Sequence, residues 1–197
     1  MPSFKLTFAF ALLLPLAGCV AAGRKVAANE VDVVHHRMAV TPASAWKKLP
    51  ASVRQTRWEE VWTLHGPQLD RLTLLAGLPE GKAVVTQDQY ADQQVPVFRA
   101  SMTARDLASM IEVSYRVQGS SVFNFESIEP VEFLGGPGIR LRYHYASGIH
   151  FEKRGSYVMR VIGRKLYALK LECVANPEFE AAMAEFDQLV ASARLRD

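Results

Sequence analysis

The chain has 197 residues, a formal net charge of +3, and hydrophobic residues at 49% of its positions. These values are typical of one globular domain and exclude a mainly disordered chain. A mean hydropathy of +0.01 excludes a polytopic membrane protein, and two cysteines exclude a disulfide-rich scaffold. So small a net charge gives no reason to expect a nucleic acid as a partner.

The first residues predict export. Lys5 is followed by an apolar run from Leu6 to Ala17. As a helix this run would span about 18 Å, which is too short to cross a bilayer core of about 30 Å. A basic start followed by a short apolar run is typical of a secretory signal peptide. The run closes with Leu16-Ala17-Gly18-Cys19.

This closing tetrapeptide resembles the lipobox of bacterial lipoproteins. The resemblance implies cleavage between Gly18 and Cys19, diacylglycerol on the Cys19 thiol, and usually an acyl chain such as palmitate on the new amine. Two or three chains hold a protein firmly in a bilayer, whereas one holds it only marginally. Val20 follows the cysteine, which in enteric-type lipoproteins implies the periplasmic face of the outer membrane rather than the inner membrane. The alternatives are an ordinary signal peptide with a chance cysteine, or a buried apolar element.

The processed chain is expected to be one domain on a tether. Residues 1–18 form the signal peptide, and residues 19–33 form the lipidated tether because they are small, polar and poorly periodic. Residues 34–197 contain no linker or repeat and form a single domain. With Cys19 lipidated, Cys173 has no disulfide partner, and its place on the apolar side of a strand pattern predicts a buried, unreactive thiol.

Two helices are expected. Asn176-Pro177-Glu178 provides an N-cap, a proline at the first helical position and an acid in the first turn, and apolar residues then recur at helical spacing as far as Ala193. Thr103 and Asp106 have the spacing of a capping box, and Gly119 can end the helix that follows them. The second half of that segment, however, has a strand-like composition.

The remaining pattern predicts strands. Residues 139–145 and 166–174 alternate apolar and polar side chains, which is typical of an antiparallel sheet with one covered face. Tyr143 and Leu169 would both lie on that face. Glycine-containing turns separate the strands: 135–138, 147–148 and 162–165. Weaker patterns predict two earlier strands: 58–64 and 69–76. Trp58 and Trp62 would, however, also suit a helix at i, i+4 spacing. The fold class is therefore α+β, an antiparallel sheet packed by at least two helices.

The segment from Gly163 to Leu195 runs as a strand, a short proline-containing break and a helix with Phe and Asp that ends in Ala-Ser-Ala. This order resembles the C-terminal signature of PsbP-like proteins, an α-β-α sandwich group with many bacterial lipoprotein and periplasmic members. The resemblance implies a sheet between helices and, for most bacterial members, no assigned catalysis. The photosynthetic role of plant members is not carried over, because no metal or partner residue of theirs has a match here.

Motifs for catalysis are absent from the sequence. It lacks a G-x-S-x-G elbow, an H-E-x-x-H pair, a phosphate loop and a dinucleotide fingerprint, so we expect neither a cofactor nor a metal. His35 and His36 are adjacent, and neighbouring side chains point apart on an extended chain. His65, before Gly66-Pro67, has the context of a turn residue.

The predicted 139–154 hairpin gathers the one candidate binding surface. An even loop that pairs Tyr145 with His150 would put His144 and His150 on opposite faces. A three-residue loop, 147–149, would instead pair Tyr145 with Phe151, which keeps both aromatic residues on the core side. That register gathers six polar side chains, the hairpin face: Arg140, Arg142, His144, His150, Glu152 and Arg154. Such a basic, pH-sensitive face could meet lipid headgroups, acidic glycan or a protein, and the alternative is a solvated sheet face.

Three functions are compatible with the sequence. The first is a non-catalytic periplasmic lipoprotein, anchored in the bilayer through Cys19, that binds an envelope protein or supports envelope assembly. The second is a carrier of a hydrophobic small molecule in the sheet–helix core, suggested by four aromatic residues that could equally be core packing: Tyr143, Tyr145, Phe151 and Tyr157. The third is an envelope-directed hydrolase using carboxylates that nothing pairs in the sequence: Glu126, Glu129 and Glu132.

Overall fold

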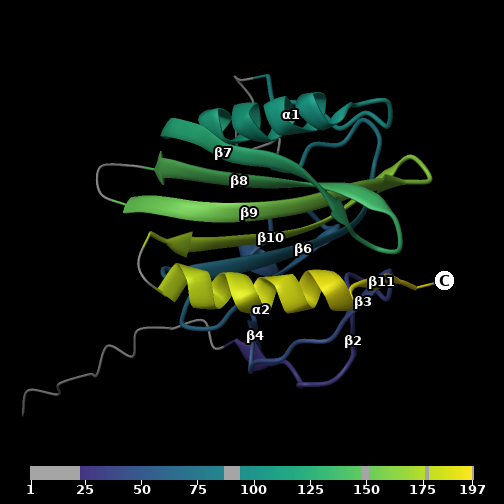
Figure 1. The fold of residues 1–197 in the computed structure, drawn as a ribbon, viewed down its shortest axis with the longest axis vertical. Coiled ribbons are helices and arrows are strands. Elements are labelled where there is room, and N and C mark those ends of the chain that lie inside the picture. Colours follow the sequence, from purple (N-terminus) through teal and green to yellow (C-terminus); the bar gives the residue numbers. More distant parts are fainter. Residues whose placement is uncertain (1–22, 87–93, 148–150, 176–177, 197) are drawn as a thin grey trace, which may run out of the picture.

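The computed structural model describes residues 23–86, 94–147, 151–175 and 178–196. A large antiparallel sheet lies between two helices (Figure 1). The elements of the first half are β1 (Arg24–Lys25), β2 (Val31–Val33), β3 (Met38–Val40), β4 (Lys47–Lys48), the 3-10 turn η1 (Ala51–Val53), β5 (Glu59–Thr63) and β6 (Asp70–Pro79). Those of the second half are α1 (Ala104–Val117), β7 (Ser120–Glu132), β8 (Pro137–Ser147), β9 (Phe151–Ile162), β10 (Lys165–Val174), α2 (Glu178–Ser192) and β11 (Arg194–Leu195).

The large sheet has eight strands in the order β1-β4-β5-β6-β10-β9-β8-β7. Strands β7 to β10 form a meander, and β10 then pairs with β6, which joins the two halves of the chain. A second sheet has the order β11-β3-β2. The predicted strands at 58–64 and 69–76 are confirmed as β5 and β6. The α+β class and the antiparallel sheet packed by two helices are also confirmed.

Helix α1 begins at the predicted capping box. The Thr103 hydroxyl accepts a hydrogen bond from the Asp106 amide, and the Asp106 carboxylate accepts one from the Thr103 amide. The chain leaves the helix at Gly119, whose φ of +86° suits a residue without a side chain. The strand-like second half is helical because its inward side chains pack on the sheet. The buried residues of α1 are Leu107, Ala108, Met110, Ile111, Ser114 and Tyr115.

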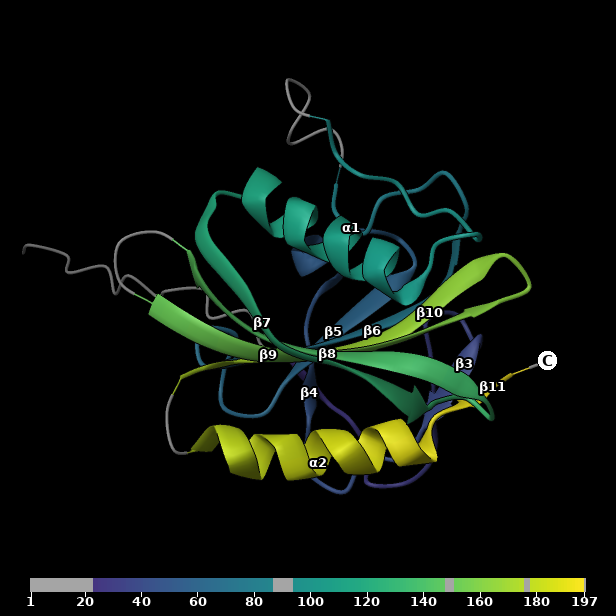
Figure 2. The same cartoon turned by 45° about the horizontal axis from the view of Figure 1, so that its top comes forward.

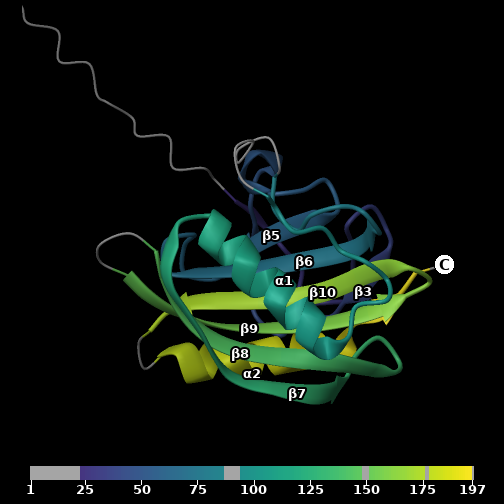
Figure 3. The ribbon, with the colours of Figure 1, turned by 90° about the horizontal axis from the view of Figure 1, so that it is seen from above.

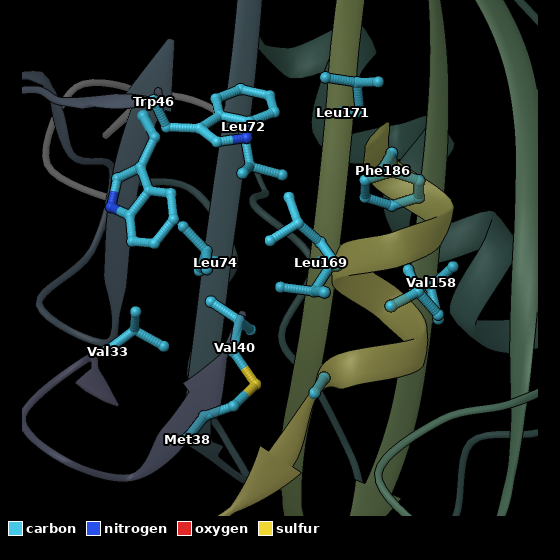
Figure 4. Close-up of a cluster of buried hydrophobic side chains, with 14 of the residues drawn as sticks. Val33, Met38, Val40, Trp46, Leu72, Leu74, Val158, Leu169, Leu171 and Phe186 are labelled. Atoms are coloured by element: carbon cyan, nitrogen blue, oxygen red, sulfur yellow. The ribbon is translucent and has the colours of Figure 1, made fainter. Parts of the chain in front are cut away.

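Helix α2 buries the predicted apolar stripe. Its inward side chains lie in the core beneath the helix, where Phe186 packs near Leu169 and Val158 (Figure 4). The buried stripe consists of Phe179, Met183, Phe186, Leu189, Val190 and Ala193. The predicted cap residues Asn176 and Pro177 lie outside the described residues.

The sheet is covered on both faces, so the prediction of one covered face was wrong. Helix α1 lies over one face and α2 over the other (Figure 2). Tyr143 belongs to the core under α1 and Leu169 to the core under α2, so they lie on opposite faces. The strand pattern predicted a solvent-facing side because β10 has the polar residues Lys170 and Glu172 at alternate positions. These polar residues face α1 and not solvent.

The folded domain begins earlier than predicted. Arg24–Lys25 pair with β4, Val31–Val33 pair with β3, and Val33 is fully buried in the core under α2. The predicted tether therefore belongs to the domain from Gly23 onward. Its short strands give no periodic signal, because their stability comes from pairing with distant segments. Cys19, its cleavage site after Gly18 and the signal peptide lie outside the described residues. In the part of the chain that is described, no helix is long and apolar enough to cross a membrane.

The β8–β9 hairpin has a different register from the predicted one. Tyr145 pairs with Lys153, and His144 pairs with Arg154, so each partner lies two residues further along β9 than predicted. An even offset leaves every side chain on its predicted face. The predicted turn at 162–165 is confirmed, with Gly163 and Arg164 at φ of +52° and +61° between β9 and β10. His150 lies outside the described residues.

Candidate functional site

Two arginines of the hairpin face form ion pairs with acidic side chains of α2 and β7. Arg140 forms an ion pair of 2.6 Å with Asp187 of α2. Arg154 pairs with Glu180 of α2 at 3.4 Å and with Glu126 of β7 at 3.1 Å. The hydrogen bond from Arg154 outweighs partial burial and lowers the pKa of Glu126. Arg140 and Arg154 are therefore not free cations, and a binding role for the hairpin face stays a prediction.

The other members of the hairpin face are dispersed. His144 lies 3.6 Å from a Glu126 oxygen and 3.2 Å from the Asn124 amide nitrogen. Arg142 is half-buried, and its Nε has no hydrogen-bond partner among the described residues. Glu152 is exposed at the start of β9. The contacts of His144 are therefore with β7 and not with α2.

A pocket of about 600 Å³ lies on the other face, between α1 and the sheet. Figure 3 looks down on α1 where it lies across this face. One wall is apolar and contains Val84, Val85 and Ile111. The floor is polar and comes from the strands: Arg71, Thr73, Lys153, Tyr157, Lys170 and Glu172. Tyr115 of α1 and Tyr145 of β8 complete the polar side.

Glu172 is the centre of a buried hydrogen-bond network in this floor. Its Oε1 accepts a hydrogen bond from the Tyr115 hydroxyl, and its Oε2 lies 3.1 Å from the Lys170 ammonium. The Tyr115 and Tyr143 hydroxyls are 2.9 Å apart. Burial acts to raise the pKa of Glu172, but Lys170 and the Tyr115 hydroxyl outweigh it and leave that pKa below its usual value. Glu172 is therefore a carboxylate at neutral pH.

The tyrosines around Glu172 stay protonated. Burial, reinforced by nearby carboxylates, raises the pKa of each phenol above its usual value. The four phenols are Tyr115, Tyr143, Tyr145 and Tyr157. The Lys170 ammonium also lies 5.4 Å from the centre of the Tyr115 ring and 5.7 Å from that of Tyr157. The floor thus presents fixed hydroxyl donors beside an immobilised ion pair.

A second carboxylate, Glu59, lines the same pocket. Burial raises the pKa of Glu59, and the hydrogen bond from the Gln55 amide only partly opposes that effect. Arg71 donates a hydrogen bond of 2.8 Å to the carbonyl oxygen of Val53. With three basic and two acidic side chains, the lining carries a formal charge of 3 − 2 = +1.

The sequence identified part of this site. Tyr143, Tyr145 and Tyr157 were candidates for a carrier; Tyr145 and Tyr157 line the pocket, and Tyr143 is linked to its floor. The side chain of Phe151 is not among those described. The sequence did not identify Lys170 and Glu172, because alternation along a strand predicts that its polar residues face solvent. The strand alone holds no signal that would have identified them, because alternation does not show whether a face meets water or a helix.

The remaining candidate residues lie outside the pocket. Glu126 is engaged by Arg154, the Glu129 carboxylate accepts a hydrogen bond from Ser127, and Glu132 is exposed at the end of β7. Cys173 is free and buried on the α2 face, as predicted, and burial raises the pKa of its thiol to about 12.

Three of the histidines lie in turns. His35 and His36 lie in the left-handed turn between β2 and β3, where the His36 Nδ1 is 2.9 Å from Asp32. His65 is confirmed as a turn residue, and its Nδ1 lies 2.9 Å from Asp70. Among the described residues, no group of three or more His, Cys, Asp or Glu side chains could hold a metal ion.

The architecture is that of an α-β-α sandwich of the PsbP-like kind. The chain is similar to the cyanobacterial PsbP protein CyanoP of Synechocystis sp. PCC 6803, with a TM-score of 0.56, 16% identity and coverage of 92% of this chain and 99% of that one. It is also similar to the Ran-binding protein Mog1p of Saccharomyces cerevisiae, with a TM-score of 0.54, 10% identity and coverage of 89% and 97%. No family model and no curated protein matches the sequence. These likenesses establish the fold, which confirms the PsbP-like resemblance at that level alone.

Proposed function

We propose that the protein is a lipid-anchored envelope protein that binds a small amphiphilic molecule, without catalysis, in the pocket between α1 and the sheet. The observation that carries this proposal is the pocket itself, with one apolar wall and one charged floor. Its volume of about 600 Å³ falls within the range of about 300–1,000 Å³ that is usual for small-molecule sites. The lipobox sequence ending at Cys19 supports the anchor.

The lining favours an amphiphile over the purely hydrophobic ligand suggested by the sequence. Val84, Val85 and Ile111 offer a surface for an apolar body. The opposite side presents hydroxyl and ammonium groups. If only hydrocarbon filled the space, these groups would lose their hydration and gain no hydrogen bond in exchange. A ligand with a polar head and an apolar body satisfies both sides.

The geometry of Glu172 supports binding without catalysis. Both of its oxygens are occupied, one by the Tyr115 hydroxyl and the other by the Lys170 ammonium. A general base or nucleophile needs a free oxygen within reach of the reacting atom. Glu172 instead fixes the floor and holds α1 to the sheet.

Native mass spectrometry of the gently purified, exported chain tests the proposal. We expect a species heavier than the processed protein by the mass of one small molecule. Val174 lines the pocket, so Val174→Trp should reduce the bound fraction by filling the space. The matched control is Ile128→Trp on β7, where the side chain is 46% exposed and outside the pocket. A wild-type protein without bound mass, or a Val174→Trp variant that binds as wild type does, contradicts the proposal.

The anchor has its own test. In cells fed labelled palmitate, the wild-type chain should take up label and partition into detergent. Cys19→Ser should do neither, because the acceptor thiol is absent. Label on the Cys19→Ser variant would refute lipidation at this residue.

One observation favours hydrolysis as a second candidate function. Glu59 and Glu172 line one pocket and their pKa values are shifted in opposite directions, but the Glu172 oxygens are occupied, so this candidate depends on Glu59. A hydrolase would release product from envelope material, and Glu59→Gln would abolish that release. Under the binding proposal, neither the wild type nor Glu59→Gln releases product.

A further inference from the structure

We propose that the pocket selects anionic amphiphiles and seats their carboxylate or phosphate head beside Lys153 and Arg71. This inference rests on the proposed function and adds the charge class of the ligand. The observation that supports it is positive charge in the pocket lining that has no carboxylate beside it.

The charges in the lining are not compensated equally. Lys170 is neutralised by Glu172 at 3.1 Å, so this pair has no net charge to offer. Within the described residues, no carboxylate oxygen lies within 4.0 Å of the charged nitrogens of Lys153 or Arg71. Arg71 is bonded to the carbonyl of Val53, which fixes its guanidinium without cancelling its charge.

The two unpaired cations lie at the same end of the sheet. The Cα of Lys153 pairs with Val174 of β10, and that of Arg71 pairs with Glu172 of the same strand. Lys153 and Arg71 therefore come from the strands on either side of β10 and are offset by two residues along it, so their Cα atoms are roughly 12 Å apart. An anion above Val174 would lie between them.

The acidic group Glu59 lies on the Arg71 side of the pocket, although its Cα is distant. Its Cα pairs with Leu75, four residues from Arg71 along β6, which corresponds to roughly 13 Å along the strand. The Gln55 amide donates a hydrogen bond to its carboxylate, so Glu59 is directed toward that loop. Glu59 nevertheless interacts electrostatically with Arg71, so the lining cation without an acidic counterpart among the described residues is Lys153.

Neutral donors favour the same kind of ligand. Tyr157 lines the pocket with a protonated hydroxyl that has no hydrogen-bond partner among the described residues, whereas the Tyr145 hydroxyl is engaged by Glu172. Hydroxyls of this kind donate to anionic oxygens, and such charge-assisted bonds are stronger than neutral ones. A cationic head would meet ammonium and guanidinium groups in the same place.

Calorimetric titration of the full exported chain with matched ten-carbon probes tests the inference. The probes are decanoate, decyl phosphate, 1-decanol and decylamine, each below its micelle concentration. We expect both anions to bind about tenfold or more tightly than the alcohol and the amine to bind most weakly. The ratio of decanoate to decyl phosphate distinguishes a carboxylate ligand from a phosphate ligand.

Lys153→Met should weaken the binding of decanoate about tenfold and leave the affinity for decanol unchanged. Lys165→Met is the matched control, because it removes the same charge from the exposed β9–β10 turn. Lys153→Arg should restore the preference, which separates loss of charge from loss of fold.

The outcomes separate the two proposals. If no probe binds, both the proposed function and this inference fail. If decanol binds as tightly as decanoate, or Lys153→Met leaves the preference intact, the pocket still binds ligands but the anion selectivity is refuted. The inference is supported if the wild type prefers the anions, if Lys153→Met loses that preference and if Lys165→Met keeps it.

Discussion

The strongest prediction concerns Glu172, which joins α1 to the sheet. Glu172→Gln keeps the shape of the side chain but removes its charge. The Lys170 side chain, which is only 19% exposed, would then hold an ammonium without a carboxylate partner. The Tyr115 hydroxyl would also lose its charged acceptor.

The expected magnitude follows from this burial. Removing one partner of a buried ion pair costs about 3–5 kcal/mol, and the partial exposure of Lys170 places this case near the lower end. We therefore expect a loss of about 3 kcal/mol in the free energy of unfolding, or about 6–12 °C in Tm for a domain of this size. Urea unfolding at pH 7, followed by circular dichroism, measures it.

The pH dependence gives a second readout. The pKa of Glu172 is lowered in the folded protein, so its contribution is complete above the usual value for a glutamate. That contribution is lost as pH falls through the lowered pKa. The stability difference between the wild type and Glu172→Gln should therefore shrink under acid.

Two further variants make the prediction refutable. Glu112→Gln removes an exposed partner of Arg116 on α1 and should cost less than about 0.5 kcal/mol. Lys170→Met combined with Glu172→Gln should recover part of the loss, since no buried charge remains unpaired. A loss below about 1 kcal/mol for Glu172→Gln, or no recovery in the double variant, would refute the role given to this pair.

Three other changes test the same description of the fold. Gly155→Ala would place a methyl group 2.4 Å from the ring of Tyr143, and we expect a loss of about 1–3 kcal/mol in urea unfolding. Thr103→Ala removes the hydroxyl that caps the Asp106 amide and should cost about 1 kcal/mol in the same assay. Glu59→Gln should stabilise the protein at pH 7 and have little effect near pH 4. Burial raises the pKa of Glu59, so its contribution to stability is lost as pH rises through that pKa.

Elements with a complete local signal could be predicted from the sequence. The apolar stripe of α2 and the capping box at Thr103 each depend on residues a few positions apart. The turn at Gly163 depends on two residues that take positive φ. In each case the determining contacts are local, so the pattern was sufficient.

The covering of the second face could not be predicted in this way. Alternation along β10 shows that Lys170 and Glu172 share a face, but not whether that face meets water or a helix. The answer depends on α1, whose Tyr115 lies 57 residues before Glu172 in the sequence. The strand at Val31–Val33 was missed for a similar reason, because its pairing with β3 leaves no periodic trace.

The candidate site combines residues from distant segments for the same reason. Arg71 comes from β6 and Lys153 from β9, and only the pairing of both strands with β10 brings them to one end of the pocket. The residues of the hairpin face, by contrast, lie close together in the sequence and could be grouped from its pattern. Two of its arginines, Arg140 and Arg154, nevertheless form ion pairs with acidic side chains of α2 and β7.

The difference between the two faces explains why the pocket is the place to expect function. Under α2 the sheet buries an apolar core, and the charged groups lie at its edge with acidic partners. Under α1 the floor keeps a buried ion pair, Lys170–Glu172, beside a space of about 600 Å³. Apolar side chains of similar volume would stabilise such a position equally well or better. Stability alone therefore does not account for the buried ion pair, which is the reason for proposing that this face recognises a polar ligand.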